Sequence, residues 1–356
     1  MPLVFVGTYT QRGSEGIYAF RFDPETGALR ATGHTAWVEN PSYLALHPEG
    51  RLLYATNEVA QFAGQPGGGI SAFTLDPDTG ALSLLNQQPS RGAAPCYVSV
   101  DPSGRYVLAA NYTSGSVTVL PIEDDGRLAP PSHVVQHEGQ GGDPSRQEGP
   151  HAHCVTFDGA GRFVFAVDLG LDKVLVYTLD AASGTLHPAP RPWAQTHPGA
   201  GPRHIAFHPN GRYAYAINEL DSTLTPFAYD GATGTLTPLE AVPTLPEGFS
   251  GTNYPADVHV HPSGRFLYGS NRGHDSIALY AIAEEPGRPR PLGHQPTGGK
   301  NPRGFVIDPS GTFLLVANQD TDNIVTFRID PDTGALTPTG QVVSVPMPVC
   351  LKFAGW

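Results

Sequence analysis

The stretch GPRHIAFHPNGRYAYAINEL, residues 201–220, decides how this chain folds. Two short apolar runs flank the tight-turn sequence HPNG, and this pattern predicts two antiparallel strands. In such a hairpin, the beginning of the first strand lies beside the end of the second. Arg203 and Glu219 are therefore expected at the same end of the hairpin, facing the same solvent.

The same unit recurs along the chain. Five further copies occupy residues 40–57, 94–111, 149–168, 254–271 and 301–318. A second signature alternates with it, from DPETGAL at residue 23 to DPDTGAL at residue 330, and its weakest copy, EEPGRPRPL, begins at Glu284. Each repeat therefore supplies four strands, and a period of about 40–50 residues with four strands is typical of a propeller blade.

The two ends of the chain complete the count of blades. The last residues, MPVCLKFAGW, contain the first strand of a copy, and the first residues, MPLVFVGTYT, contain the second strand. Joined, they make a seventh blade, and this closure protects the edges that an open sheet would expose. The sequence predicts an all-β, seven-bladed β-propeller with four antiparallel strands per blade, a closing blade built from both termini, and one domain over residues 1–356.

Composition excludes several classes of partner. The net charge of −12 argues against a nucleic-acid partner, and no window of eighteen apolar residues predicts a membrane span. The three cysteines, Cys96, Cys154 and Cys350, have no CxxC spacing, which argues against a disulfide framework or a structural zinc site. The N-terminus also lacks a signal-peptide pattern, so we expect a cytoplasmic protein. We also expect a monomer or a weak homodimer.

One face of the predicted disc carries the variable connections. Long loops at residues 58–69, 137–149 and 245–254 leave from that face, whereas the short, stereotyped turns lie on the other. Two positions per blade border this mouth. The strand-start position holds Ser42, Cys96, His153, Arg203, Ala256, Arg303 and Val349, and the strand-end position holds Glu58, Tyr112, Leu169, Glu219, Arg272, Gln319 and Tyr9.

These positions gather His153, Arg203, Glu219, Arg272, Arg303 and Glu58 around one funnel, with Lys300 just before the strand of Arg303. Converging arginines suit a carboxylate or phosphate, which they can bind bidentately. The competing interpretations are salt bridges between blades for the arginines and Glu219, a loop-supporting role for His151, and a buried thiol for Cys96. The HxH spacing of His151 and His153 lacks further ligands at matching spacing, so no metal is expected. The remaining candidates for substrate contact are His151, His204, Glu58 and Asn253.

Three motifs of this sequence are similar to those of a known family. GPHAH, GPRHIAFHPNGRYAYAINE and SNRGHDSI resemble the seven-bladed lactonase family, which contains propeller-type 6-phosphogluconolactonases and 3-carboxy-cis,cis-muconate lactonizing enzymes. The resemblance covers essentially the whole chain. It implies a catalytic set at His153, Arg203, Glu219 and Arg272, and a site that uses no metal or other cofactor.

Three functions are compatible with this funnel. The first is hydrolysis of a sugar lactone, 6-phosphogluconolactone above all, with His153 or Glu219 as general base, Arg203 at the oxyanion and Arg272, Arg303 and Lys300 on the phosphate. The second is muconate lactonization, in which the arginines would hold carboxylates. The third is a non-enzymatic propeller that binds a protein or peptide.

Overall fold

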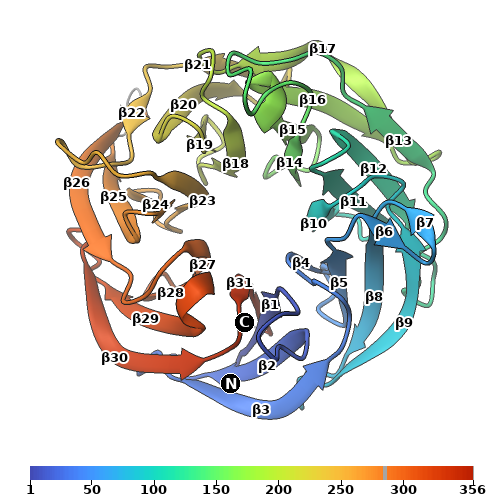
Figure 1. Ribbon diagram of the computed structural model, residues 1–356, viewed down its shortest axis with the longest axis horizontal. Helices are drawn as coiled ribbons and strands as arrows, with labels where there is room; N and C mark the ends of the chain where they lie inside the picture. Colours follow the sequence, from blue (N-terminus) through green and yellow to red (C-terminus); the bar gives the residue numbers. More distant parts are fainter. Residues whose placement is uncertain (284–286, 356) are drawn as a thin grey trace.

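The chain forms a closed ring of seven blades around a central axis (Figure 1). The computed structural model describes residues 1–283 and 287–355, so the first three residues of the weak copy at Glu284 lie outside the described residues. Each blade is an antiparallel sheet of four strands, which confirms the predicted seven-bladed propeller. No helix among these residues is long and apolar enough to cross a membrane.

The strands fall into four concentric positions (Figure 1). The innermost strands are β31 (Pro348–Ala354), β4 (Leu44–Leu46), β10 (Pro95–Val100), β14 (Ala152–Phe157), β18 (Pro202–Phe207), β23 (Tyr254–Val260) and β27 (Pro302–Ile307). The second strands are β1 (Leu3–Thr8), β5 (Leu52–Asn57), β11 (Tyr106–Asn111), β15 (Val164–Asp168), β19 (Tyr213–Asn218), β24 (Phe266–Arg272) and β28 (Phe313–Asn318).

The third strands are β2 (Ile17–Phe22), β8 (Gly69–Leu75), β12 (Ser116–Pro121), β16 (Lys173–Asp180), β20 (Thr223–Asp230), β25 (Ser276–Ile282) and β29 (Asn323–Ile329). The outer strands are β3 (Leu29–Ala36), β9 (Leu82–Pro89), β13 (His133–Gln136), β17 (Thr185–Gln195), β21 (Thr235–Pro238), β26 (Pro289–Pro296) and β30 (Leu336–Ser344). Short additions are β22 (Val242–Pro243), which pairs with β20, the hairpin β6 (Gln61–Phe62) and β7 (Gln65–Pro66), and the 3-10 turns η1 (Leu169–Leu171) and η2 (Gln319–Thr321).

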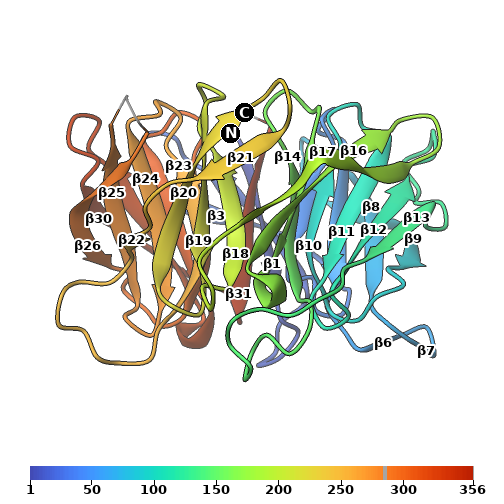
Figure 2. The ribbon, with the colours of Figure 1, turned by 90° about the horizontal axis from the view of Figure 1, so that it is seen from above.

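The closing blade joins the two ends of the chain as predicted. Strand β1 pairs with β31 in a register that sets Leu3 opposite Ala354 and Gly7 opposite Cys350. Both termini lie at the same face of the disc, at the top of Figure 2. Because the first and last strands share one sheet, the ring has no open edge at the point of closure.

Apolar residues of neighbouring blades form the core between the sheets. Strands such as β11 and β28 are buried along their whole length, because a blade covers each of their faces. Hydrogen bonds also cross from blade to blade: the Tyr54 hydroxyl donates to the Gly126 carbonyl, and the Tyr268 hydroxyl to the Gly334 carbonyl. These bonds fix the orientation of each blade relative to its neighbour. The inner strands therefore keep constant positions around the central axis.

A β-bulge shapes the mouth end of the innermost strands. Pro202 pairs with Asn218 and His204 with Ile217, so Arg203 between them has no partner across the ladder. Equivalent register shifts leave Val349, Cys96, His153 and Arg303 unpaired, and a similar shift occurs at residues 256–257. A bulge re-aims a side chain, so the strand-start position predicted from the repeats is a position of special backbone geometry.

Candidate active site at the mouth of the propeller

The mouth contains a pocket of about 250 Å³, open to the face that carries the long loops. Eight residues line it, and all of them belong to the two mouth positions of the repeats: Tyr9, Glu58, Cys96, Tyr112, His153, Glu219, Arg272 and Arg303. Directly beneath lies a smaller cavity with room for about one water molecule, lined by Arg203 and His204 among others. Cys96 and Arg303 border both cavities, so the two spaces adjoin.

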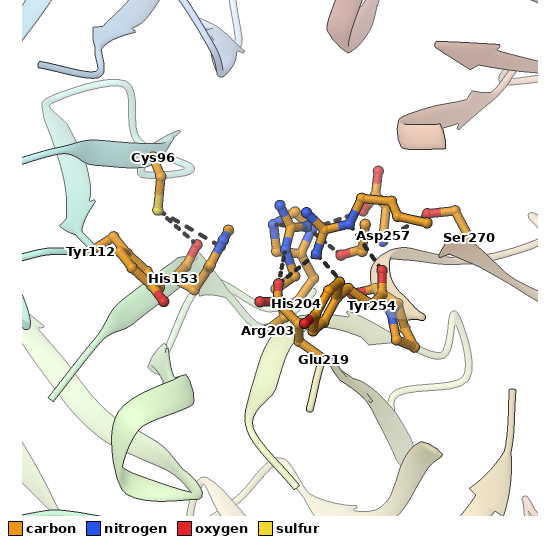
Figure 3. A network of polar contacts seen from close by, with 12 residues as sticks. Cys96, Tyr112, His153, Arg203, His204, Glu219, Tyr254, Asp257 and Ser270 are labelled. Carbon is orange, nitrogen blue, oxygen red and sulfur yellow. Dashed lines mark hydrogen bonds and ion pairs between the residues drawn. The ribbon is translucent and has the colours of Figure 1, made fainter. Parts of the chain in front are cut away.

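Glu219 is the hub of the charged cluster (Figure 3). Its Oε2 lies 2.6 Å from Nη2 of Arg272 and 3.2 Å from Nε of Arg203, and its Oε1 accepts a 3.0 Å hydrogen bond from Nη2 of Arg146. The Arg203 contact has the distance of an ion pair without the alignment of a hydrogen bond. Three guanidinium groups from separate parts of the chain therefore converge on one carboxylate.

The electrostatics of Glu219 follow from these neighbours. Burial by itself would raise the pKa of the Glu219 carboxyl, but the charges of Arg272 and Arg203 and the hydrogen bond from Arg146 outweigh it and lower the pKa to about 2. Burial also lowers the pKa of Arg272 to about 10, although the ion pair with Glu219 opposes this shift. At neutral pH Glu219 is thus an anion with little tendency to take up a proton.

His153 lines the same pocket from the blade next to that of Glu219, beside Cys96 (Figure 3). Burial, followed by the charge of Arg203, holds the pKa of His153 well below its usual range. Burial likewise raises the pKa of the Cys96 thiol, whose Sγ lies 3.7 Å from His153 Nδ1. Because a reactive cysteine needs a thiolate, this pair is a neutral imidazole beside a neutral thiol, and not a nucleophilic dyad.

Arg303 makes no hydrogen bond or ion pair with another residue in the part of the chain that the structure describes. Its guanidinium carbon lies 5.4 Å from the centre of the Tyr9 ring, and the Tyr9 hydroxyl donates to Glu58 at 3.0 Å. Burial opposes the charge of Arg303, but the neighbouring Tyr9 and Glu58 raise its pKa. The side chain is therefore a cation at the pocket wall with free donors for a ligand.

Arg146 belongs to this cluster although sequence reasoning missed it. It extends from the loop at residues 137–149 to Glu219, its guanidinium lies 5.7 Å from the Tyr254 ring, and its Nη2 is 3.4 Å from the Tyr112 hydroxyl. The loop itself was singled out by its length. Nothing in the repeat could select Arg146, because the residue has no counterpart in the other blades.

Comparisons with known proteins identify the family. The family profile described as "Lactonase, 7-bladed beta-propeller" matches residues 3–353. This chain belongs to that family. A Bacillus subtilis protein named 6-phosphogluconolactonase is 41% identical over 353 residues, which cover 98% of this chain and 97% of that protein.

Solved structures resemble this lactonase equally closely. The Pseudomonas aeruginosa periplasmic gluconolactonase is 36% identical with a TM-score of 0.93, covering 99% of both chains. A Bacteroides fragilis crystal structure is 38% identical with a TM-score of 0.93, covering 99% of this chain and 98% of that one. The resemblance inferred from the sequence motifs is thereby confirmed.

The lactonase fold brings together the four residues expected to be catalytic. Arg203 and Arg272 contact Glu219, and His153 lines the same pocket as Glu219 and Arg272. The register also resolves the insertion in blade three. Ala152 pairs with Asp168 as Pro202 pairs with Asn218, so His153 and not His151 occupies the position of Arg203.

The remaining predicted contact residues differ in their placement. Glu58 and Arg303 line the pocket, and His204 lies below it in the smaller cavity. His151 stacks on Tyr112 with ring centres 4.6 Å apart, and its Nδ1 is 3.0 Å from the Tyr112 carbonyl oxygen.

Lys300 and Asn253 are not among the residues that line either cavity. The Asn253 amide donates to Asn271 at 3.1 Å, and its oxygen accepts from the His274 backbone. Lys300 is exposed on the loop before β27. A substrate contact for these two residues stays a prediction, whereas Arg146 is a stronger candidate from its position.

No group of three His, Cys, Asp or Glu side chains within residues 1–283 and 287–355 is arranged to hold a metal ion. The pocket instead offers a neutral imidazole, several guanidinium groups and two tyrosine hydroxyls. Such a set can bind an anion, move one proton and stabilise a developing negative charge.

Proposed function

We propose that this lactonase hydrolyses 6-phosphogluconolactone to 6-phosphogluconate, as its Bacillus subtilis relative is named to do. The supporting observation is the charge of the mouth. Four guanidinium groups, those of Arg146, Arg203, Arg272 and Arg303, face two carboxylates, Glu58 and Glu219. About two positive charges are left in a protein of net charge −12, and a phosphomonoester carries roughly −1.5 to −2 at neutral pH.

The pocket suits a small substrate. Its volume of about 250 Å³ is below the roughly 300–1,000 Å³ of sites for drug-sized ligands, as expected for a single sugar ring. Tyr112 and Tyr254 border the arginine cluster (Figure 3). Their rings offer flat apolar faces, while the guanidinium groups offer paired donors for phosphate oxygens.

In the proposed mechanism His153 is the general base. Its imidazole is neutral at pH 7 and takes a proton from a water molecule that attacks the lactone carbonyl carbon. Arg203 donates to the oxyanion of the tetrahedral intermediate. Collapse of the intermediate breaks the bond to the ring oxygen, and this oxygen takes the proton back from His153. The products are a hydroxyl and a carboxylic acid, which loses its proton to the solvent and becomes a carboxylate.

Glu219 has a different role in this scheme. Both oxygens of its carboxylate contact guanidinium groups, and a carboxylate with a pKa of about 2 has little tendency to accept a proton. Its ion pairs with Arg203 and Arg272 instead hold these cations at the pocket despite their mutual repulsion. We therefore assign Glu219 to positioning the arginines and His153 to moving the proton.

The other two functions receive less support. The similar proteins described above are named 6-phosphogluconolactonase or gluconolactonase, which supports lactone hydrolysis over muconate lactonization or protein binding. We also propose a cytoplasmic location and a monomeric or weakly dimeric state. The three cysteines are free and buried, which suits a reducing compartment.

A direct assay tests the proposal. Purified protein is given 6-phosphogluconolactone, gluconolactone and 3-carboxy-cis,cis-muconate, and turnover is measured above the spontaneous rate. The highest kcat/KM is expected for the phosphorylated lactone. Arg203→Ala and His153→Ala should each lower kcat by roughly 10²-fold or more while the circular dichroism spectrum is retained. Turnover of the muconate alone, or near-normal lactone turnover in both variants, would contradict the assignment.

A further inference from the structure

A second layer of polar side chains lies beneath the mouth, around the smaller cavity, and His204 and Asp257 of this layer are labelled in Figure 3. Nη1 of Arg203 is 3.2 Å from Nε2 of His204, and Nδ1 of His204 is 2.8 Å from Oδ1 of Asp257. Oδ2 of Asp257 is in turn 3.1 Å from Nε2 of His259. The layer is buried: His204 and Asp257 are each 5% exposed.

The donors and acceptors in this chain fix the protonation of His204. A guanidinium nitrogen can only donate, so Nε2 of His204 accepts from Arg203 and carries no proton. Nδ1 must then carry the proton and donate it to Asp257. Burial and the adjacent charge of Arg203 lower the pKa of His204 to about 4, against the opposing effect of Asp257. His204 is therefore neutral at physiological pH, in a single tautomer.

Asp257 is built to remain a carboxylate in this position. Its two oxygens accept from His204 and His259 and from the backbone N–H groups of Val258 and Phe305, at 3.0 and 3.3 Å. Burial opposes the charge, but the two histidines outweigh it and hold the pKa of Asp257 well below its usual range. A buried anion with four donors is a rigid acceptor.

We propose that His204 and Asp257 are positioning residues that hold the Arg203 guanidinium in its orientation toward the lactone oxyanion. This inference rests on the proposed lactonase activity. Asp257 fixes the tautomer of His204, and His204 presents an acceptor to Nη1 of Arg203. The Ala256 carbonyl accepts from the same nitrogen. With Nη1 anchored below, Nε of Arg203 stays directed toward Glu219 at the mouth.

Glu219 alone could not supply this anchor. Glu219 contacts Nε of Arg203 from the mouth side, and its carboxylate is shared among three arginines. When an anionic substrate enters, it competes for the same guanidinium groups. The contact between His204 and Arg203 lies on the side of the smaller cavity, so it can persist while the contacts at the mouth change.

Two substitutions at one position test the inference. Asparagine places its amide near the Nδ1 position of histidine, so His204→Asn keeps the contact to Asp257 and loses the acceptor for Arg203. Glutamine places its amide oxygen near the Nε2 position, so His204→Gln keeps the acceptor. We expect H204N to lower kcat on the order of 10- to 100-fold with a smaller change in KM, and H204Q to retain at least about tenfold more activity than H204N.

Tyr43→Phe is the matched control. Tyr43 borders the same cavity and lies edge-on to the His204 ring at 5.9 Å, without a contact to Arg203. Near-normal kcat is expected for Y43F. Equal loss in H204N and H204Q would mean that His204 only fills space, and unchanged activity in both would mean that Arg203 needs no anchor. Either result overturns the proposal.

The tautomer can be read without any substitution. The groups that surround His204 and could perturb it are Arg203, Asp257, His259, His153, Tyr43, Tyr97, Arg303 and Lys352. In the wild-type protein with ¹⁵N-labelled histidine, NMR correlation spectra should show an unprotonated Nε2 and a protonated Nδ1 for His204 at pH 7. The opposite tautomer overturns the proposal, even if H204N does not fold. Absence of lactone turnover in wild type would instead refute the proposed function.

Discussion

Replacing Glu219 by glutamine tests the central ion cluster most directly. E219Q keeps the size of the side chain and removes the charge that faces three guanidinium groups. The substitution imitates a protonated Glu219, so the pKa of the native carboxyl gives the magnitude. That pKa falls from an ordinary 4.5 to about 2, and each unit corresponds to about 1.4 kcal/mol. The expected loss of unfolding free energy at pH 7 is about 3 kcal/mol.

The pH dependence has a definite sign. The folded pKa lies below the unfolded value, so the stabilisation is fully present above pH 4.5 and disappears as the pH falls toward 2. By linkage, the difference between wild type and E219Q should shrink from about 3 kcal/mol at pH 7 to about 1 kcal/mol at pH 3. The side chain of Glu219 is only 9% exposed, so solvent screening reduces these values little.

Urea unfolding of both proteins at the two pH values measures the effect. Glu240→Gln is the matched control, because Glu240 also pairs with an arginine, Arg288, but the two side chains are 72% and 48% exposed. An exposed pair contributes about 0–1 kcal/mol, so E240Q should unfold almost as wild type does. If E219Q is as stable as E240Q at pH 7, or if its deficit does not change with pH, the account of the cluster is wrong.

Three further predictions concern the pocket. Arg303→Met should raise KM for 6-phosphogluconolactone by roughly 10-fold or more and should change KM for gluconolactone less. Lys300→Met should leave both KM values near those of wild type. A comparable rise in K300M would show that Lys300 reaches the phosphate. The acid limb of the pH profile of kcat/KM should lie well below pH 6.5, because the lowered pKa of His153 keeps its base form populated down to that pKa. R303M should move this limb to higher pH, because the charge of Arg303 contributes to lowering the pKa of His153. A limb at pH 6.5 or above would exclude His153 as the base. Cys96→Ser should keep kcat within about threefold, because a thiol with a raised pKa is no nucleophile; loss of all turnover would restore the Cys–His pair as a candidate.

The sequence by itself determined the architecture and most of the pocket wall. The repeated turns set the number of blades, and the period of each blade assigned every mouth position without coordinates. All eight residues that line the pocket come from those positions. This was possible because a propeller repeats one local unit, so a residue's place in its repeat also gives its place around the ring.

Only the tertiary structure showed which charged groups contact one another at the mouth. The sequence left His153 and Glu219 as equal candidates for the base, because protonation depends on burial and neighbours from other blades. The structure surrounds Glu219 with three arginines and buries His153, and on this ground we propose different roles for the two residues. Arg146 and Asp257 escaped notice for the same reason: one lies on a loop unique to its blade and the other acts through a contact between adjacent strands, β18 and β23. Such contacts are long-range in sequence, and a repeat pattern carries no record of them.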